Sequence, residues 1–245
     1  MNAPDFGRAM GMVRAGQGYF FRGFRRWPVI AGLLAVLGML TAGSTGYVAA
    51  APGVSAPASD PGAPTAAEMQ AALLTAADLG PPFTPQTSTG GTSATTVTGC
   101  EPLAGMLNAP SGPEGTQAEA EFTAGDQGPY LAETLATTPD QVALANGYEQ
   151  LRAAVAQCRS LTFHSEGSAV LTFDGTPMDF GGPGSAALRL DGTYQGIQIN
   201  GYVAVEKLGP VILGYVYFQV GSGSSQLAVA YYTQAAAKAR PLSAG

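Results

Sequence analysis

Apolar side chains recur with two different periods along residues 65–240. Between residues 141 and 158 they stand three or four positions apart, which is the spacing of one face of an α-helix. The members of this stripe are Leu144, Tyr148, Leu151, Val155 and Cys158. Over much of residues 161–220 they fall at every second position, which predicts β-strands. Asp-Gly pairs at residues 174–175 and 191–192 are typical of turns between strands.

These patterns predict an α+β fold. We expect helices at residues 65–79, from residue 100, and at 139–158 and 224–238. We expect strands at residues 118–123, 130–136, 161–164, 169–173, 188–190, 197–206 and 211–220. Because consecutive strands have short connections, the fold should be a mainly antiparallel twisted sheet of about five to seven strands, with helices packed on it and one disulfide. The strand at residues 211–218 is apolar on both sides and should be central.

A basic and then apolar segment precedes this domain. Residues 29–40 are almost entirely apolar, five arginines stand before them, and small residues follow. This arrangement is typical of a secretory signal peptide, which would cover residues 1–50. An uncleaved membrane anchor over residues 29–51 is the alternative, and in both cases the domain would lie outside the cytoplasm. Residues 51–64 are rich in Pro and Ala and would form a linker to a domain at residues 65–240.

The charge of the chain limits its partners. From Ala51 onward there are six basic and sixteen acidic residues, so the exported part has a net charge near −10. A body this acidic is repelled by phosphate backbones, which argues against nucleic acid as a partner. Anionic lipid surfaces are disfavoured for the same reason, so contact with a membrane is expected only through an uncleaved N-terminal segment.

The chain has two cysteines, Cys100 and Cys158, and each lies at an end of a predicted helix. An oxidising compartment would favour their pairing, and closing a loop of about 59 residues stabilises by about 4 kcal/mol on the chain-entropy model. Two free buried thiols are the alternative. Two cysteines and one distant histidine lack the spacing of zinc ligands, so no metal site is expected.

Several of these segments together resemble a known family. They are Leu73-Leu74-Thr75-Ala76-Ala77-Asp78-Leu79, Cys100-Glu101-Pro102-Leu103, the strand around Phe122, and the helix that ends at Cys158. Over roughly residues 65–238 the chain is similar to the extracellular sensor domain of the mycobacterial serine/threonine kinase PknH and its secreted and lipoprotein relatives in actinobacteria.

The resemblance implies an α+β domain with a twisted antiparallel sheet and a cleft that binds a ligand. It also implies that Cys100 and Cys158 match one disulfide of the family. The chain departs from the family pattern in lacking a kinase domain, a lipobox cysteine and a second cysteine pair. Signalling by phosphorylation and lipid anchoring therefore do not carry over.

The sequence contains no recognisable catalytic motif. The single histidine, His164, has no serine in a Gly-x-Ser-x-Gly context to act on. Asp174, Asp179 and Asp191 could supply a carboxylate pair for glycoside hydrolysis, but two of them precede glycine, where aspartate is common in turns. The glycine-rich stretch at residues 181–184 lacks the end of a phosphate cradle. We expect neither catalysis nor a cofactor.

Two predicted strands carry a polar and aromatic face. On the strand at residues 197–206, Gln198, Asn200 and Tyr202 alternate together, and on the strand at residues 211–220 Tyr215 and Tyr217 do the same. If the strand register brings these five side chains to one side, they would line a small-ligand cleft. A solvated sheet face, or tyrosines packed under a helix, is the alternative interpretation.

The leading hypothesis is therefore an exported, non-catalytic, sensor-like domain that binds a small ligand or envelope component. A structural or protein-interaction module of the cell envelope, without a small ligand, is the alternative.

Overall fold

The computed structural model describes most of the predicted domain. The described residues are 63–86, 95–108, 115–125, 128–165, 170–182, 184–194, 196–221 and 223–244. The predicted signal peptide and all but the last two residues of the predicted linker lie outside them. Within these ranges, no helix is long and apolar enough to cross a membrane.

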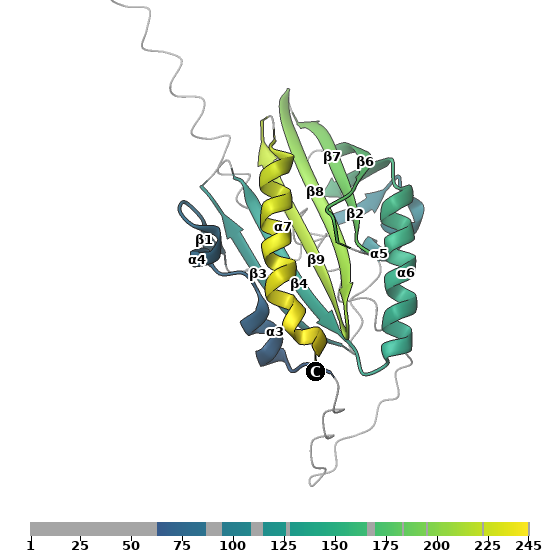
Figure 1. Ribbon diagram of the computed structural model, residues 1–245. Coiled ribbons are helices and arrows are strands. Elements are labelled where there is room, and N and C mark those ends of the chain that lie inside the picture. Colours follow the sequence, from purple (N-terminus) through teal and green to yellow (C-terminus); the bar gives the residue numbers. More distant parts are fainter. Residues whose placement is uncertain are drawn as a thin grey trace, which may run out of the picture.

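The described residues form one antiparallel sheet of nine strands in the order β1-β3-β4-β9-β8-β7-β6-β5-β2 (Figure 1). The strands are β1 (Thr84–Gln86), β2 (Thr95–Thr98), β3 (Thr116–Thr123), β4 (Tyr130–Thr137), β5 (Ser160–Ser165), β6 (Leu171–Met178), β7 (Ala186–Tyr194), β8 (Ile197–Leu208) and β9 (Val211–Val220). As predicted, β9 lies inside the sheet between β4 and β8, and its residues 211–218 are buried on both faces.

The sheet is larger than the five to seven strands expected. The two additional strands are β1 and β2, which pair with β3 and β5 as the outermost strands of the sheet. Both are short and rich in Thr, and β1 contains Pro85. An edge strand with polar residues on both sides has no apolar alternation, so the pattern that identified the other seven strands is absent here.

Helices cover both faces of the sheet. They are α3 (Ala66–Ala72), α4 (Ala76–Leu79), α5 (Glu101–Asn108), α6 (Gln141–Gln157) and α7 (Ser225–Ala239), followed by the 3₁₀ turn η3 (Arg240–Ala244). Figure 1 shows α7 running along the sheet beside β9, with α3 near its C-terminal end, and α6 standing at the other side of the molecule. The two faces bury separate apolar cores, one under α3 and α7 and one under α5 and α6.

The predicted helix at residues 65–79 is two helices. Thr65 and Glu68 form a capping box at the start of α3, and Thr75 and Asp78 repeat the same arrangement at the start of α4. Leu73 ends α3 with an extended backbone. A second Thr-Ala-Ala-acid motif so soon after the first competes with helix continuation, because the threonine and aspartate satisfy backbone groups that a continuous helix would use. This break shapes the site described below.

The packing of α5 against α6 brings the two cysteines together. Cys100 directly precedes α5 and Cys158 follows the last turn of α6, so their sulfur atoms lie 2.8 Å apart. They are buried free thiols here, so the predicted disulfide is not formed, because a disulfide bond would need about 2.05 Å. Burial and the neighbouring Cys100 thiol raise the pKa of the Cys158 thiol to about 12.

Candidate functional site

The candidate site is the layer of side chains between α7 and the face of the sheet formed by β4, β9 and β8. Large rings fill it, and we call them the aromatic layer: Phe180, Tyr202, Tyr215, Tyr217 and Tyr232. Ring centroids are 6.2 Å apart for Tyr202 and Tyr217, 5.7 Å for Tyr215 and Tyr232, and 5.1 Å for Phe180 and Tyr232. These are the separations of offset and edge-to-face aromatic pairs.

The sequence of α7 explains why the helix approaches the sheet so closely. Its buried residues are four alanines and one tyrosine, namely Ala228, Tyr232, Ala235, Ala236 and Ala239. Small side chains let the helix backbone lie near the rings that stand on the strands. The sheet therefore supplies most of the bulk in this layer, and the helix acts as a thin cover over it.

The strand register places the predicted ligand-binding residues on one face. Tyr202 pairs with Tyr217, and Tyr215 lies one step further along β9, opposite Ala204. All three tyrosines are fully buried beneath α7. The strand register thus brings these side chains to one side of the sheet. There the tyrosines are packed under a helix, which is the alternative interpretation of this face.

The two remaining predicted residues lie at the end of the same face. Asn200 is buried, donates to the Asp191 carboxylate and accepts a hydrogen bond of 2.9 Å from the Gly223 backbone N–H. Gln198 is exposed. Asn200 thus fixes the connection into α7, whereas Gln198 lies beyond the part that α7 covers.

Polar atoms with unmet hydrogen-bonding capacity lie in the same layer. Among the described residues, the buried atoms without a hydrogen-bond partner are Glu133 Oε1, Thr134 Oγ1, Tyr202 OH and Tyr215 OH. Glu133 is the register partner of Tyr215, so the glutamate and both tyrosines share the α7 face. Each such group carries a desolvation cost of about 1–3 kcal/mol and would gain from a partner.

Glu133 is the most strongly perturbed carboxyl group of this face. It stands on β4 with 0% of its surface exposed, and its Oε2 atom accepts a hydrogen bond of 2.8 Å from the Leu74 backbone N–H. Burial raises the pKa of Glu133 to about 7, although the Leu74 N–H and the positive charge of Lys238 act in the opposite direction. The group therefore titrates near neutral pH.

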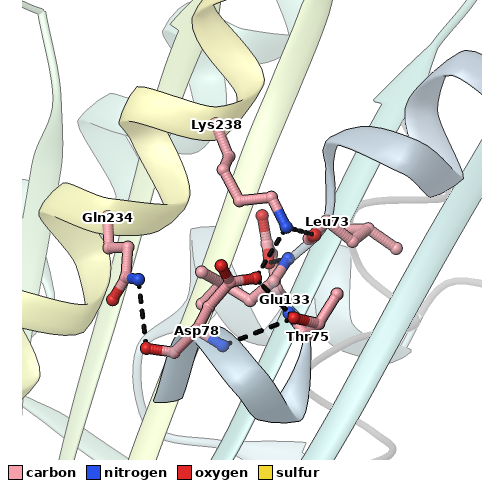
Figure 2. Close-up of polar contacts among 7 residues, drawn as sticks. Leu73, Thr75, Asp78, Glu133, Gln234 and Lys238 are labelled. Carbon is pink, nitrogen blue, oxygen red and sulfur yellow. Dashed lines mark hydrogen bonds and ion pairs between the residues drawn. The ribbon is translucent and has the colours of Figure 1, made fainter. Parts of the chain in front are cut away.

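Lys238, near the end of α7, ties the helix to the turn between α3 and α4 (Figure 2). Its ammonium donates to the Leu73 carbonyl at 2.6 Å and to Asp78 Oδ2 at 2.7 Å. The ammonium lowers the pKa of Asp78, and the Thr75 hydroxyl and backbone N–H add to that effect. One turn earlier, Gln234 Nε2 donates to the Asp78 carbonyl at 3.1 Å.

A second buried carboxylate holds the middle of α7. Glu206 on β8 accepts a hydrogen bond of 2.6 Å from the Tyr232 hydroxyl. Burial and this bond raise the pKa of Tyr232. Gly182 packs against the same carboxylate, because a Cβ atom there would lie 2.7 Å from Glu206 Oε1.

The groups considered for catalysis lie on the part of this face that α7 does not cover. His164 Nε2 lies 2.9 Å from the Thr98 hydroxyl, as a cross-strand contact. Asp174 is exposed and stands opposite Asp191, which is bound by Arg189 at 2.9 and 3.0 Å. Asp179 lies beyond the end of β6. This carboxylate pair is open to solvent, whereas a glycosidase acid works in a sheltered pocket that raises its pKa.

Comparison with known proteins shows a likeness in fold. No family model matches the chain, and no curated protein matches its sequence. The crystal structure of the extracellular domain of PknH from Mycobacterium tuberculosis aligns with a TM-score of 0.54 at 13% sequence identity, covering 71% of this chain and 94% of that domain. The two domains have a similar fold. At this identity the likeness to PknH establishes the fold alone, and family membership stays a prediction.

Sequence reasoning missed the charged residues near the C-terminal end of α7, above all Glu133, Asp78 and Lys238. One signal was available: Glu133 is a charged residue in the middle of a strand that is otherwise apolar or small, YLAETLAT. Its contacts with Leu74, 59 positions earlier, and the reach of Lys238 to Asp78, 160 positions earlier, follow only from the tertiary fold.

Proposed function

We propose that this protein is an exported, non-catalytic, sensor-like domain that binds a small extracytoplasmic ligand between α7 and the sheet. The N-terminal sequence supports export, and the similar fold of the PknH extracellular domain supports a role outside the cytoplasm. The ligand site is the aromatic layer together with Glu133.

The observation that carries this proposal is the set of unmet polar atoms inside an otherwise apolar layer. Glu133 Oε1, Tyr202 OH and Tyr215 OH lack partners among the described residues, and all three share the α7 face. A ligand that supplied hydrogen bonds to them would remove a desolvation cost and stack on the surrounding rings. Polar groups in an aromatic setting are typical of small-molecule sites.

Access to this layer requires movement of α7, because the tyrosines on the strands are fully buried. The helix is well suited to move. Its sheet-facing side is mostly alanine, so its displacement exposes little apolar surface of its own. Its polar attachments are few: Tyr232 to Glu206, and Lys238 and Gln234 to the α3–α4 turn. Opening of such a cover on ligand binding would give a sensor its two states.

Outside the cytoplasm we propose that a thiol–disulfide oxidoreductase of that compartment accepts two electrons and two protons from the thiols of Cys100 and Cys158, which then form a disulfide. Their approach across the α5–α6 contact supports this pairing, since only a small shift would bring the sulfur atoms to bonding distance. The bond would fix the core on the face of the sheet opposite α7. Oxidised protein should have a mass two hydrogen atoms below that of the reduced chain.

Native mass spectrometry of the protein recovered from the culture medium tests the proposal. The mass of a chain that begins at Ala51 would show cleavage and export. An additional peak for that chain with a non-covalently bound molecule would show a retained ligand. Bare mature protein after gentle isolation would favour the alternative, an interaction module of the envelope. Full-length chain found only in the membrane fraction would identify the N-terminal segment as an anchor.

A further inference from the structure

One corner of the α7 face is built to hold an ammonium group. Its acceptors are the Leu73 carbonyl and Asp78 Oδ2, the buried Glu133 side chain stands next to them, and none of the three residues belongs to α7. The ammonium of Lys238 binds the first two, at 2.6 and 2.7 Å. Figure 2 shows the Glu133 carboxylate beside the same ammonium. A primary ammonium carries three donors, and two of those of Lys238 are used on these two acceptors.

The acceptors are held in place by contacts that do not involve the lysine. The backbone N–H and hydroxyl of Thr75 both donate to Asp78 Oδ2 at 2.7 Å. Leu73 has an extended backbone at the end of α3, with ψ of 156°, so its carbonyl points out of the helix. The Leu74 N–H holds the Oε2 atom of Glu133 at 2.8 Å. The corner would therefore keep its shape if another ammonium took the place of Lys238.

Two further observations indicate that the corner accepts a ligand. Glu133 Oε1 is fully buried and has no hydrogen-bond partner among the described residues, so a polar atom with unmet hydrogen-bonding capacity adjoins the corner. The side chains of Lys238 and Asp78 are 29% and 26% exposed. Solvent thus reaches both side chains of this ion pair.

We propose that this corner is a binding site for the ammonium group of a primary amine, and that Lys238 fills it in the structure as an internal substitute that holds α7 closed. The inference rests on the proposed function, because it names the chemistry of the ligand that α7 covers. An amine that displaces Lys238 releases the end of α7 and gives its substituent access to the aromatic layer. The strongly acidic body of the domain favours a cationic ligand.

The test removes the internal ammonium and supplies it from solution. Lys238→Ala in the full chain deletes three methylene groups and the nitrogen, which together correspond to n-propylammonium. At tenfold excess over its Kd, n-propylammonium chloride should raise the thermal midpoint of the variant by about 3 °C. It should bind the variant at least tenfold more tightly than the wild type, where Lys238 competes at high effective concentration.

Four controls separate specific binding from salt effects. Tetramethylammonium chloride has the same charge but no N–H donor, and n-propanol has the same length but no charge, so neither should raise the midpoint of the variant. Lys207→Ala removes a lysine that bonds the Gly209 carbonyl outside the corner, and n-propylammonium should not affect it. Adding Asp78→Asn to Lys238→Ala should abolish the response. If Lys238→Ala is partly unfolded, binding can be measured at a fixed temperature instead. The folded fraction of the variant should then rise with the concentration of n-propylammonium.

Equal responses to n-propylammonium and tetramethylammonium, or a response that survives Asp78→Asn, would overturn the ammonium site. That result would leave the proposed function standing if the exported protein still retains a ligand. The opposite combination is also possible. A thermal midpoint of Lys238→Ala that rises only with n-propylammonium would support the ammonium site, and exported protein without a bound ligand would count against the proposed function.

Discussion

Glu133→Gln should remove a pH dependence of stability that the buried carboxyl group imposes. Glu133 has a pKa of about 7 in the folded protein, against 4.5 for an ordinary glutamate side chain. Between these values the unfolded chain has lost the proton and the folded chain still holds it, so the free energy of unfolding falls as pH rises. The stabilising contribution is fully present below pH 4.5 and lost above pH 7.

The size of the effect follows from the two pKa values. The full difference corresponds to about 3 kcal/mol, of which about 2.5 kcal/mol is lost between pH 5 and pH 8. Glutamine has the same shape and does not titrate, so the difference in unfolding free energy between Glu133→Gln and wild type should grow by that amount over this range. In thermal midpoint this is a relative gain of about 7 °C for the variant.

Urea denaturation at pH 5, 6, 7 and 8 measures this difference. All other titrating groups are common to the two proteins, so their contributions cancel in the comparison. Glu149→Gln provides the control, because Glu149 lies exposed on α6 and pairs with Arg152 at the surface. A difference between Glu133→Gln and wild type that stays constant from pH 5 to pH 8 would show that Glu133 is ionised in the folded protein throughout, and would refute the reasoning.

Three further substitutions probe the same architecture. Tyr232→Phe should lower the free energy of unfolding by about 2 kcal/mol in urea titrations, because it leaves the buried Glu206 carboxylate without its donor; an unchanged midpoint would mean that water replaces the hydroxyl. Gly201→Ala should cost about 1–3 kcal/mol by the same measurement, because its Cβ atom would collide with the ring of Phe218, and a neutral result would contradict the close packing of β8 on β9. Thr75→Ala should cost about 1 kcal/mol and weaken protection of the α4 amides in hydrogen exchange, whereas unchanged protection would show that the second capping box is dispensable.

The central part of the fold follows from the sequence because its strands and helices are amphipathic or fully apolar. The stripe that ends at Cys158 gives α6, and residues 211–218 give a central strand, since each pattern reports directly which side is buried. The edge strands β1 and β2 escaped prediction because little of their surface is buried in the sheet, so selection for alternation is weak there. The break between α3 and α4 escaped prediction because its local sign is a second capping box at Thr75, a motif that marks the start of a helix and not the end of the one before it.

The candidate site was predictable only in part. Alternation places Tyr202 on one side of β8 and Tyr217 on one side of β9, and the register confirms that these sides coincide. What covers them was not predictable, because α7 presents alanines to the sheet and its apolar pattern is weak. The contacts of Lys238 with the α3–α4 turn join segments at opposite ends of the domain, and no local pattern records such a contact.

The proposed function requires that a small ligand occupies the layer between α7 and the sheet. Its most direct test compares wild-type protein with a Tyr202→Phe, Tyr215→Phe double variant, both recovered from culture medium and examined side by side by native mass spectrometry. The double variant removes only two hydroxyl groups that lack partners among the described residues, so the fold should persist. We expect a retained species on the wild type that is lost or strongly reduced on the double variant. Equal retention by both proteins, or bare protein in both, would contradict the claim.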